Sequence, residues 1–508
     1  MVLANEQATQ KFAIDLAAAL GPGDLVTLSG DLGTGKTTFA RALIRHLAGD
    51  KLLEVPSPTF TLVQNYALPR FAVIHADLYR LSGPDDLDEL GIDDAAKHSV
   101  VLVEWPDRAA ETLPRDRLDI ALFIEPGLGL NARRVQVTGW GSFAPRTQRL
   151  IDIRAFLDQA GFGAAERRHL QGDASSRAYE RLLLGSKSAV LMNAPRRPDG
   201  PAVRNGKPYS AIAHLAEDVQ PFVAMARALR KRGFSAPDIY AADLAEGLLI
   251  LEDLGGDTIV RGEPPAPIVE RYEAAVDVLI ALHAEPLPRT LPVAPNVEYS
   301  LPDYDSEALL IEAELLLDWY FPYRGGSVSG GDRQEFIALW QQMLARPLAD
   351  PPSWVLRDFH SPNLLWLAQR DGIARVGLLD FQDAVMGPGA YDVASLLQDA
   401  RVDVPEAMEI ALLGRYVKER RDKDPTFDPA RFVEFYATLG AQRATKILGI
   451  FARLNRRDGK PQYLRHLPRV WNYLQRSLTH PALAPLRTWY DKHVPQPDLP
   501  SSVSKIEG

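Results

Sequence analysis

The segment from residue 30 to 37, GDLGTGKT, has the spacing of a phosphate-binding loop. It fits the pattern G-x-x-x-x-G-K-[ST] and lies between an apolar, strand-like run at 25–28 and a helical pattern at 38–47, which is the context that this motif requires. Glycines allow successive backbone N–H groups to face the phosphates, and the N-terminus of the following helix adds positive potential. The agreement of strand, loop and helix favours a nucleotide site over a chance glycine-rich turn.

Within this loop, Lys36 is expected to reach the β- and γ-phosphates of a nucleoside triphosphate, and Thr37 to ligate Mg²⁺. The predicted nucleotide-binding residues of the loop are Asp31, Gly33, Thr34, Gly35, Lys36, Thr37 and Thr38. Two acidic residues that follow apolar runs could hold the metal or its water, namely Asp77 in HADLYRL and Glu104 in LVEWP. In a parallel sheet both would stand at the carboxyl ends of strands, where ligands bind. An isolated Asp after a strand is as often a helix cap, so the pair carries more weight than either residue alone.

A second candidate site combines RDFHSPN at 357–363 with LLDFQ at 378–382. Phosphoryl transfer to a hydroxyl needs a carboxylate that orients the hydroxyl or accepts its proton, and oxygen ligands that hold Mg²⁺ on the phosphates. We assign the first role to Asp358 and the second to Asn363 and Asp380. The D-x-x-x-x-N spacing is weak evidence by itself, since Asp and Asn are common in loops, but the second acid at a predicted strand end favours a kinase-like site.

The two sites require at least two domains, because 508 residues exceed what one hydrophobic core usually supports. In the first third, helical spacing at 7–20 alternates with strand-like runs, which predicts a parallel sheet covered by helices. These predicted strands are 25–28, 71–75 and 99–103. Periodicity is lost in TGWGSFAPRT at 138–147 and a helical pattern begins at Ile151, so we place the domain boundary there.

The second part opens with strand-like segments at 181–184 and 189–192 and becomes helical after Pro264. This order predicts a small lobe that contains a sheet, followed by a larger helical lobe. The final segment, 491–508, is rich in Pro and Ser with little to bury, and we expect it to be disordered.

Composition excludes several function classes. The chain has no Cys, which removes disulfides, thiol nucleophiles and thiolate metal sites and suits a reducing compartment. Its net charge of -9 does not suit a protein that holds nucleic acid by phosphate neutralisation alone. No basic and apolar leader or membrane-length apolar window is present, so we expect a soluble, cytoplasmic protein.

Several motifs of the first part occur in the order and spacing of the TsaE family, the ATPases of bacterial tRNA threonylcarbamoyladenosine biosynthesis. They are GDLGTGKTTFAR, VPSPTFTLVQNY, HADLYRL, LDELGIDD and LVEWPDR. The resemblance covers nearly all of residues 1–140 and implies a domain that uses ATP to drive the partner proteins which transfer the threonylcarbamoyl group to adenosine 37 of tRNA. It implies that tRNA is contacted only indirectly, which agrees with the acidic net charge.

The same resemblance assigns roles to individual residues. It implies Mg²⁺ near Thr37 and Glu104, a switch-like segment at 57–59, and an acid important for hydrolysis at Asp77. It also implies that Trp105 flanks the nucleotide, although an ordinary core or surface aromatic would look the same.

The second part, over roughly residues 148–490, resembles the aminoglycoside phosphotransferase family, whose members share a bilobal, protein-kinase-like fold. Within it the sequence looks most like the branch that contains AmgK, the anomeric kinases of N-acetylmuramate and N-acetylglucosamine. The segments that carry this resemblance are LQGDASSRAYERL at 170–182, VLMNAP at 190–195, LLILEDLG at 248–255 and LRDFHSPNLLWL at 356–367. Many kinases place a phosphate-pairing Lys where VLMNAP has Met192 and Asn193. The loop 172–177 with Arg177 could replace it.

The sequence therefore predicts an α/β P-loop NTPase domain followed by a bilobal α+β phosphotransferase domain. The first hypothesis is a tRNA-modification ATPase joined to an amino-sugar kinase of cell-wall recycling. The alternative is a nucleotide-gated binding module joined to a kinase for an aminoglycoside, choline or a homoserine-like acceptor. Loss of catalysis in the second domain is a further alternative, which the joint presence of Asp358, Asn363 and Asp380 argues against.

Overall fold

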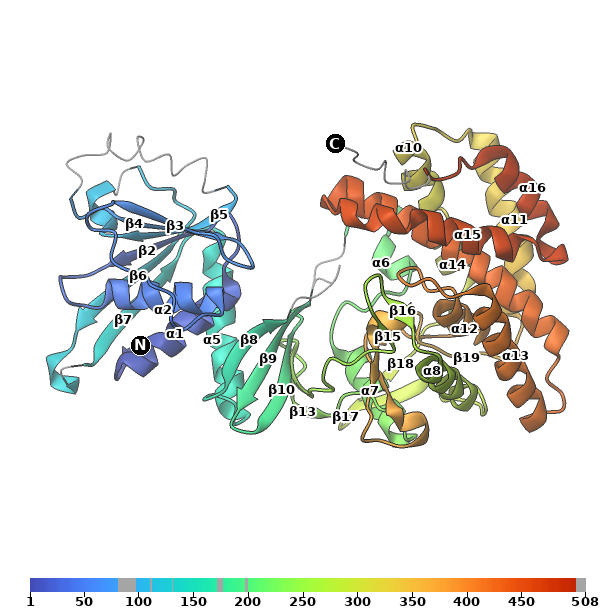
Figure 1. Cartoon of the computed structure of the whole chain (residues 1–508), viewed down its shortest axis with the longest axis horizontal. Coiled ribbons are helices and arrows are strands. Elements are labelled where there is room, and N and C mark those ends of the chain that lie inside the picture. The colour runs from blue at the N-terminus through green and yellow to red at the C-terminus, as the bar shows by residue number, and fades with distance from the viewer. Residues whose placement is uncertain (81–96, 110–111, 130, 171–176, 197–199, 499–508) are drawn as a thin grey trace, which may run out of the picture. The chain divides into compact units, whose positions relative to one another are not determined.

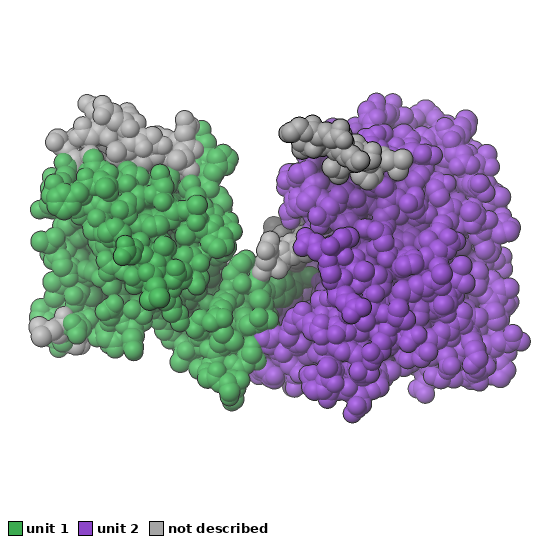
Figure 2. All heavy atoms as spheres, in the orientation of Figure 1, with its two compact units in different colours: residues 1–191 green, residues 192–508 purple. Residues whose placement is uncertain are grey.

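The computed structural model describes residues 1–80, 97–109, 112–129, 131–170, 177–196 and 200–498. The chain forms two compact units, residues 1–191 and 192–508, coloured separately in Figure 2. Among the described residues, no helix is both long enough and apolar enough to cross a membrane.

Unit 1 contains a seven-stranded sheet of order β1-β7-β6-β2-β5-β4-β3 (Figure 1). Its central strands β2, β4, β5 and β6 are parallel to one another, while β1, β3 and β7 run antiparallel to their neighbours. The strands are β1 (Val2–Leu3), β2 (Leu25–Ser29), β3 (Val63–Tyr66), β4 (Ala72–Asp77), β5 (Ser99–Glu104), β6 (Leu118–Ile124) and β7 (Arg133–Gly139). The three strands predicted from the sequence correspond to β2, β4 and β5.

The central strands consist almost entirely of apolar residues because both faces of the sheet are covered, as is usual for parallel strands. All six residues of β5 are buried. Helices α1 (Glu6–Ala19) and α2 (Lys36–Ala48) pack together and share one core cluster with the sheet. The short helices η1 (Pro106–Ala109) and η2 (Pro126–Leu128) follow β5 and β6.

The segment expected to be a loop at 138–147 is instead the end of β7 and the start of α5 (Phe143–Gln159). The helix begins eight residues before Ile151 because Phe143 is buried in the same core cluster as α1 and α2. Ile151 itself is 57% exposed, so the apolar residue that suggested the helix start does not mark its buried face. Strands β8 (Glu166–Leu170), β9 (Ala178–Leu184) and most of β10 (Lys187–Asn193) complete unit 1, with β8 antiparallel to β9.

Unit 2 is mainly helical, as predicted, with short hairpins between the helices. Its strands are β11 (Ala202–Arg204), β12 (Lys207–Pro208), β13 (Ile239–Asp243), β14 (Leu248–Glu252), β15 (Val260–Arg261), β16 (Ala266–Pro267), β17 (Thr290–Ala294), β18 (Val297–Ser300), β19 (Ser353–Val355), β20 (Leu364–Trp366), β21 (Val376–Leu378) and β22 (Val385–Gly387). Its α-helices are α6 (Tyr209–Ile212), α7 (Gln220–Lys231), α8 (Val269–Leu282), α9 (Ser306–Ala313), α10 (Phe321–Tyr323), α11 (Gly330–Leu348), α12 (Ala390–Leu397), α13 (Glu406–Lys423), α14 (Pro429–Asp458), α15 (Leu467–Leu478) and α16 (Ala484–His493). The shorter helices are η3 (Leu316–Tyr320), which is a π-helix, η4 (Ser361–Asn363), η5 (Gly372–Arg375), η6 (Pro461–His466) and η7 (Pro481–Leu483).

The 30-residue helix α14 is the centre of the unit 2 core and packs against α12, α15 and η3 (Figure 1). Gly449 allows its close approach to the segment before η3, because a Cβ there would lie 2.3 Å from the backbone of Leu315. The position of α14 matters for function because it brings residues far along the chain next to the loop between β19 and β20.

The segment predicted to be disordered, 491–508, is ordered in its first part. Helix α16 continues to His493, the Pro495 carbonyl accepts a hydrogen bond of 2.7 Å from the Tyr320 hydroxyl, and Asp498 pairs with Arg324. These contacts order a segment that composition alone would leave free. Residues 499–508 lie outside the described part of the chain.

Candidate functional site

The phosphate-binding loop connects β2 to α2, as its motif predicted. Gly30, Gly33 and Gly35 have φ angles of 130°, 81° and 101°, a region that other residues rarely adopt. A Cβ on Gly30 would come within 2.2 Å of the carbonyl oxygen of Leu122 on β6. The loop therefore needs glycine both for its backbone conformation and for its contact with the sheet.

Lys36 is held at the loop by neutral partners. Its Nζ donates hydrogen bonds to the carbonyl oxygens of Gly30 at 2.8 Å and Asp31 at 3.0 Å, and lies 3.7 Å from the centroid of the Trp105 ring. Burial lowers the pKa of Lys36, although Glu104 and nearby Asp carboxylates act in the opposite direction. An ammonium bound only to carbonyls at a helix N-terminus is suited to exchange them for phosphate oxygens.

Glu104 lies at the end of β5, next to Thr37. The Thr37 hydroxyl donates to Glu104 Oε2 at 3.0 Å, and Glu104 Oε1 lies 2.9 Å from His75 Nε2. Glu104 is only 2% exposed. The hydroxyl and carboxylate are the oxygen ligands that Mg²⁺ accepts, so this pair fits the predicted metal site. His75, which the sequence analysis did not single out, orients the carboxylate and stands two residues before Asp77 in the same HADLYRL motif.

Asp77 pairs in register with Glu104 on the neighbouring strand, so the sheet brings the two predicted acids together. Its Oδ2 accepts hydrogen bonds from Thr59 at 2.8 Å and Ser57 at 3.2 Å, and its Oδ1 accepts one from the backbone N–H of Tyr79 at 3.0 Å. Asp77 thus anchors the segment 57–59 beside the phosphate loop.

Two further residues support the loop. Trp105 has a φ of 60°, unusual for a bulky residue, and its ring lies 4.9 Å from that of Tyr79. Arg133 on β7 donates from Nε to the Thr34 carbonyl at 2.9 Å and from Nη2 to the Gly33 carbonyl at 3.3 Å. Sequence analysis missed Arg133 because it lies about 100 residues from the motif that it contacts.

The remaining loop residues have different environments. Asp31 and Gly33 are exposed, whereas Thr34 is buried and its hydroxyl donates to the Asp31 carbonyl at 2.8 Å. Thr38 lies in the first turn of α2 and lines a cavity on that helix. The structure therefore brings together Lys36, Thr37, Asp77, Glu104 and Trp105, whereas Thr38 lines the cavity on α2.

In unit 2, the loop between β19 and β20 carries the predicted catalytic residues. Buried carboxylates fix its backbone: Asp392 accepts from the N–H groups of Leu356 at 2.6 Å and Arg357 at 2.9 Å, and Asp399 accepts from the Ser361 N–H at 2.8 Å. Burial raises the pKa of Asp392 to about 7, although the two backbone hydrogen bonds oppose that shift. Both carboxylates come from α12 and the turn that follows it, which the sequence analysis did not connect to this loop.

Asp358 is the carboxylate that this loop presents, with 41% of its side chain exposed. Burial opposes its charge, but His360, Lys446 and Arg357 outweigh burial and hold the pKa of Asp358 below its usual range. His360 Nε2 lies 3.7 Å from Asp358 Oδ1. Asp358 is therefore an anion at neutral pH, able to accept a hydrogen bond or a proton from a hydroxyl.

Asn363 and Asp380 belong to neighbouring segments. The Asn363 side-chain amide donates to the backbone carbonyl of Asp358 at 3.0 Å, and the backbone carbonyl of Asn363 accepts from the Leu379 N–H at 2.9 Å. Asp380 has a φ of 57°, and its Oδ1 accepts from Gln382 Nε2 at 2.7 Å. Both predicted oxygen ligands thus lie beside the loop that carries Asp358, and amide and carboxylate oxygens fit Mg²⁺.

A buried charge network lies behind Asp358. Glu312 on α9 is fully buried, pairs with Arg357, accepts from Lys446 Nζ at 2.7 Å and accepts from the Tyr304 hydroxyl at 2.6 Å. Burial would raise the pKa of Glu312, but Lys446 and Arg357 lower it. Glu312 therefore belongs to the buried core of unit 2. Sequence analysis missed Lys446, which contacts Glu312 from 134 residues further along the chain.

The structure describes only part of the segment that is predicted to bind the ATP phosphates in the kinase domain. Met192 is fully buried at the end of β10, so the usual Lys position has no cation. Most of the loop 172–177 lies outside the described residues, and Arg177 is its only described member. The phosphate-binding role of Arg177 stays a prediction.

Comparison with known proteins gives matches to both halves of the chain. The model of the phosphotransferase enzyme family matches residues 166–433, and that of the threonylcarbamoyl adenosine biosynthesis protein TsaE matches residues 3–127. An N-acetylmuramate/N-acetylglucosamine kinase of Caulobacter vibrioides is 44% identical over 354 residues, which cover 67% of this chain and 95% of the relative. A kinase of the same name from Pseudomonas aeruginosa is 35% identical over 62% of this chain and 84% of its own length. The tRNA threonylcarbamoyladenosine biosynthesis protein TsaE of Rickettsia bellii is 40% identical over 24% of this chain and 83% of its own length.

The chain belongs to both families. Its fold class is therefore the predicted one, an α/β P-loop NTPase domain followed by a bilobal, protein-kinase-like phosphotransferase domain. Both domains belong to families of ATP-using enzymes, so the chain combines an ATPase with an ATP-dependent phosphotransferase.

Proposed function

We propose that this chain hydrolyses ATP in tRNA threonylcarbamoyladenosine modification through its N-terminal domain and phosphorylates N-acetylmuramate and N-acetylglucosamine, at the anomeric hydroxyl, through its C-terminal domain. The observation that carries the kinase assignment is the 44% identity to the Caulobacter vibrioides kinase across 95% of that relative. The 40% identity to the Rickettsia bellii TsaE supports the ATPase assignment.

In the proposed kinase reaction, Asp358 accepts a hydrogen bond from the attacking sugar hydroxyl and takes its proton as the bond to the γ-phosphorus forms. The bond from the γ-phosphorus to the bridging oxygen breaks, and ADP leaves. Asn363 and Asp380 would hold Mg²⁺, which neutralises charge on the ATP phosphates. Arg177 and the backbone of the loop 172–177 would replace the missing Lys. The buried pairing of Glu312 with Arg357 and Lys446 keeps the catalytic loop in place.

In the proposed ATPase site, Lys36 exchanges its carbonyl partners for the β- and γ-phosphates of ATP. Thr37 and Glu104 would hold Mg²⁺, and their present contact of 3.0 Å supports this role. Asp77 would couple the nucleotide to the segment 57–59, because its carboxylate already binds both hydroxyls of that segment. Trp105 would flank the nucleotide.

We assign residues 1–140 to the ATPase domain and 148–490 to the kinase domain. The proposed partners of the first are the proteins of the threonylcarbamoyl-transfer complex, with tRNA bound only through them. The proposed substrate of the second is an amino sugar. A cytoplasmic location follows from these assignments, since ATP and the tRNA that the partner proteins modify are found there.

The kinase assignment is tested by supplying the full chain with Mg²⁺, ATP and a panel of acceptors. N-acetylmuramate and N-acetylglucosamine should be phosphorylated, with phosphorus NMR placing the phosphate on the anomeric oxygen. Transfer to an aminoglycoside or choline but to neither sugar would replace this proposal by the alternative acceptor class. Transfer to no acceptor would support loss of catalysis.

A further inference from the structure

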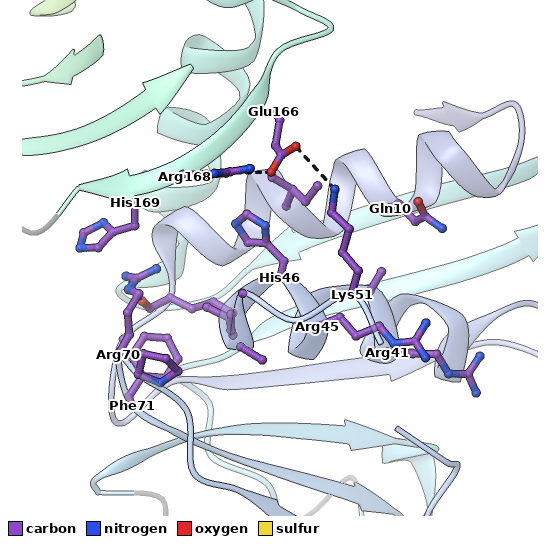
Figure 3. Close-up of a pocket in the computed structure, with 18 of the residues that line it drawn as sticks. Gln10, Arg41, Arg45, His46, Lys51, Arg70, Phe71, Glu166, Arg168 and His169 are labelled. Carbon is purple, nitrogen blue, oxygen red and sulfur yellow. Dashed lines mark hydrogen bonds and ion pairs between the residues drawn. The ribbon is translucent and has the colours of Figure 1, made fainter. Parts of the chain in front are cut away.

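Unit 1 contains a cavity of about 1080 Å³ that is lined by both family regions (Figure 3). One wall comes from α1, α2 and the loop before β4, all within the TsaE match of residues 3–127. The other wall is β8, which begins at residue 166, where the phosphotransferase match begins. The cavity therefore needs both parts of the fusion, and a protein with only one of the two domains would lack one wall.

Strand β8 is fixed to the ATPase domain by buried ion pairs. Arg167 is 2% exposed, and its guanidinium pairs with Asp15 of α1 at 2.5 Å and with Glu180 of β9 at 2.6 Å. Arg154 of α5 binds the same Asp15 carboxylate, with Nε at 2.8 Å. Successive strand residues point to opposite sides, so Glu166 and Arg168 face the cavity while Arg167 anchors the strand. These ion pairs hold β8 against the rest of unit 1, so the strand forms a fixed wall of the cavity.

The cavity is positively charged, although the chain as a whole has a net charge of -9. Five Lys or Arg residues line it against only two carboxylates, Glu6 and Glu166. Glu166 is shared between two of these cations, Arg168 at 2.9 Å and Lys51 at 3.6 Å. The pairing of Glu166 with both is visible as dashed lines in Figure 3. A local excess of positive charge in a concave site concentrates anions.

Arg41 and Arg45 are the cations best placed to bind a ligand. Among the described residues, each donates a hydrogen bond only from its Nε, Arg41 to the Val55 carbonyl at 3.0 Å and Arg45 to the Leu53 carbonyl at 2.8 Å. In the described part of the chain, neither has a carboxylate partner. They stand one turn apart on α2, so their terminal nitrogens are presented from one helix face. A fork of guanidinium nitrogens matches phosphate oxygens in geometry and charge.

The rest of the lining fits an organic molecule better than a bare ion. Arg70 is committed to the protein, because its terminal nitrogens donate to the carbonyls of Ala17 at 3.0 Å and Leu20 at 3.2 Å. Burial lowers the pKa of His46, which adds a ring without added charge at neutral pH. Phe71 and Ile14 add apolar surface. The volume is slightly above the usual range for small-molecule sites and far exceeds the need of one phosphate group.

We propose that this cavity binds a small phosphorylated organic molecule, with its phosphate on Arg41 and Arg45, and that the fusion of the two domains creates the site. None of residues 30–37 lines the cavity, so it is distinct from the phosphate-binding loop, although Thr38, the residue that follows the loop, lies in its wall. Both sites use α2, whose first residue is Lys36, so the ligand contacts the helix that carries the ATPase lysine. A phosphorylated sugar and a nucleotide share the required chemistry.

The absence of Cys allows a local test in the full chain. A Leu52→Cys substitution places one thiol beside the cavity, on a residue that is 87% exposed and does not line it. A fluorophore on this thiol would be titrated with inorganic pyrophosphate, N-acetylglucosamine 1-phosphate or AMP, while a saturating non-hydrolysable Mg-ATP analogue fills both ATP sites. We expect saturable binding of pyrophosphate and of at least one organic phosphate, and the two organic probes distinguish the sugar and nucleotide sources.

Variants on each wall sharpen the test. Arg41→Gln with Arg45→Gln should weaken pyrophosphate binding by about ten-fold or more, as expected for lost charged hydrogen bonds, and Arg168→Gln should weaken it less. Arg134→Gln, which removes a half-exposed Arg of the same unit outside the cavity, should leave binding unchanged. If the double Gln variant loses its folded thermal transition, the Arg41→Lys and Arg45→Lys pair serves instead and should retain measurable binding.

Three results would overturn the proposal. The first is the absence of a saturable signal with any phosphate probe. The second is equal binding by the wild type and the double Gln variant. The third is saturation by tRNA with no response to the small probes. An unchanged affinity in Arg168→Gln and Glu166→Gln together would refute the role of β8, and with it the claim that the fusion creates the site.

Discussion

A lysine lies in or beside each of the two proposed ATP-dependent sites, but the two lysines are held in opposite ways. Lys36 is bonded to neutral carbonyls of its own loop, and burial lowers its pKa. Lys446 is paired with the buried carboxylate of Glu312, which raises its pKa against the effect of burial. Lys36 therefore has carbonyl partners that phosphate oxygens can replace. Lys446 instead stays paired with Glu312 and stabilises the core behind the loop that carries Asp358.

The difference extends to the construction of the two sites. The phosphate loop is one continuous segment shaped by glycines and completed by the ends of two adjacent strands. The kinase site is supported by α9, α12 and α14, which together span more than a hundred residues of sequence. Substitutions in the first should act mainly on nucleotide chemistry, while substitutions around the second should also change stability.

The largest expected effect is on kinase activity in Asp358→Asn. An amide cannot take the hydroxyl proton, and positioned bases contribute roughly 100- to 10,000-fold in rate. We expect phosphorylation of N-acetylglucosamine to fall by this factor, measured with labelled ATP, while ATP binding to the kinase domain persists. A loss below ten-fold would remove Asp358 from the catalytic role.

Lys446→Met should destabilise unit 2 by about 3–5 kcal/mol, because it leaves the buried charge of Glu312 without one of its partners. Urea unfolding followed by tryptophan fluorescence would measure this change, since six of the eight Trp residues lie in unit 2. Lys423→Met, at an exposed position at the end of α13, is the matched control and should change stability little. Equal effects of the two substitutions would contradict the contrast between the lysines.

Glu104→Gln should raise the Mg²⁺ concentration needed for half-maximal ATP hydrolysis by roughly 10- to 100-fold, the usual effect of losing a metal-site ligand or its support. Hydrolysis would be measured at fixed ATP with the partner proteins present. Thermal unfolding of the variant serves as the control for folding. An unchanged Mg²⁺ dependence would exclude Glu104 from the metal site.

The smallest effect concerns pH. Because His360, Lys446 and Arg357 hold the pKa of Asp358 low, its carboxylate stays charged as the pH falls from about 8 to about 5. Protonation of Asp358 should therefore not reduce the kinase kcat in this pH range. His360→Asn removes the nearest of these groups and should move the acid decline of kcat to higher pH. An acid decline above pH 5 that is the same in wild type and His360→Asn would contradict the assignment.

The sequence predicted the contiguous parts of this protein well. The glycine loop, the strands before Asp77 and Glu104, and the D-x-x-x-x-N loop carry local signals, because the chemistry constrains neighbouring residues. Parallel pairing of β4 and β5 then makes Asp77 and Glu104 neighbours, which the strand-end argument anticipated.

The supporting residues could not be found in the same way. Arg133, Asp392 and Lys446 act through tertiary contacts with loops far away in sequence, and an Arg, Asp or Lys in a helix or strand has no local pattern that marks such a role. The start of α5 was misplaced because glycines at 139 and 141 suggested a loop, whereas burial of Phe143 stabilises the helix. Contacts of Pro495 and Asp498 likewise order part of a tail that composition predicted to be free.

The central claim is that one chain carries two separate ATP sites with separate chemistry. It is tested most directly by measuring ATP hydrolysis with the tRNA-modification partner proteins and sugar phosphorylation on the same preparations of wild type, Lys36→Ala and Asp358→Asn. In Lys36→Ala, ATP hydrolysis should fall by about 100-fold or more, because a cation that stabilises the phosphates is lost, and kinase activity should be unchanged. In Asp358→Asn, kinase activity should fall and ATP hydrolysis should be unchanged. Loss of both activities in either folded variant would contradict the account.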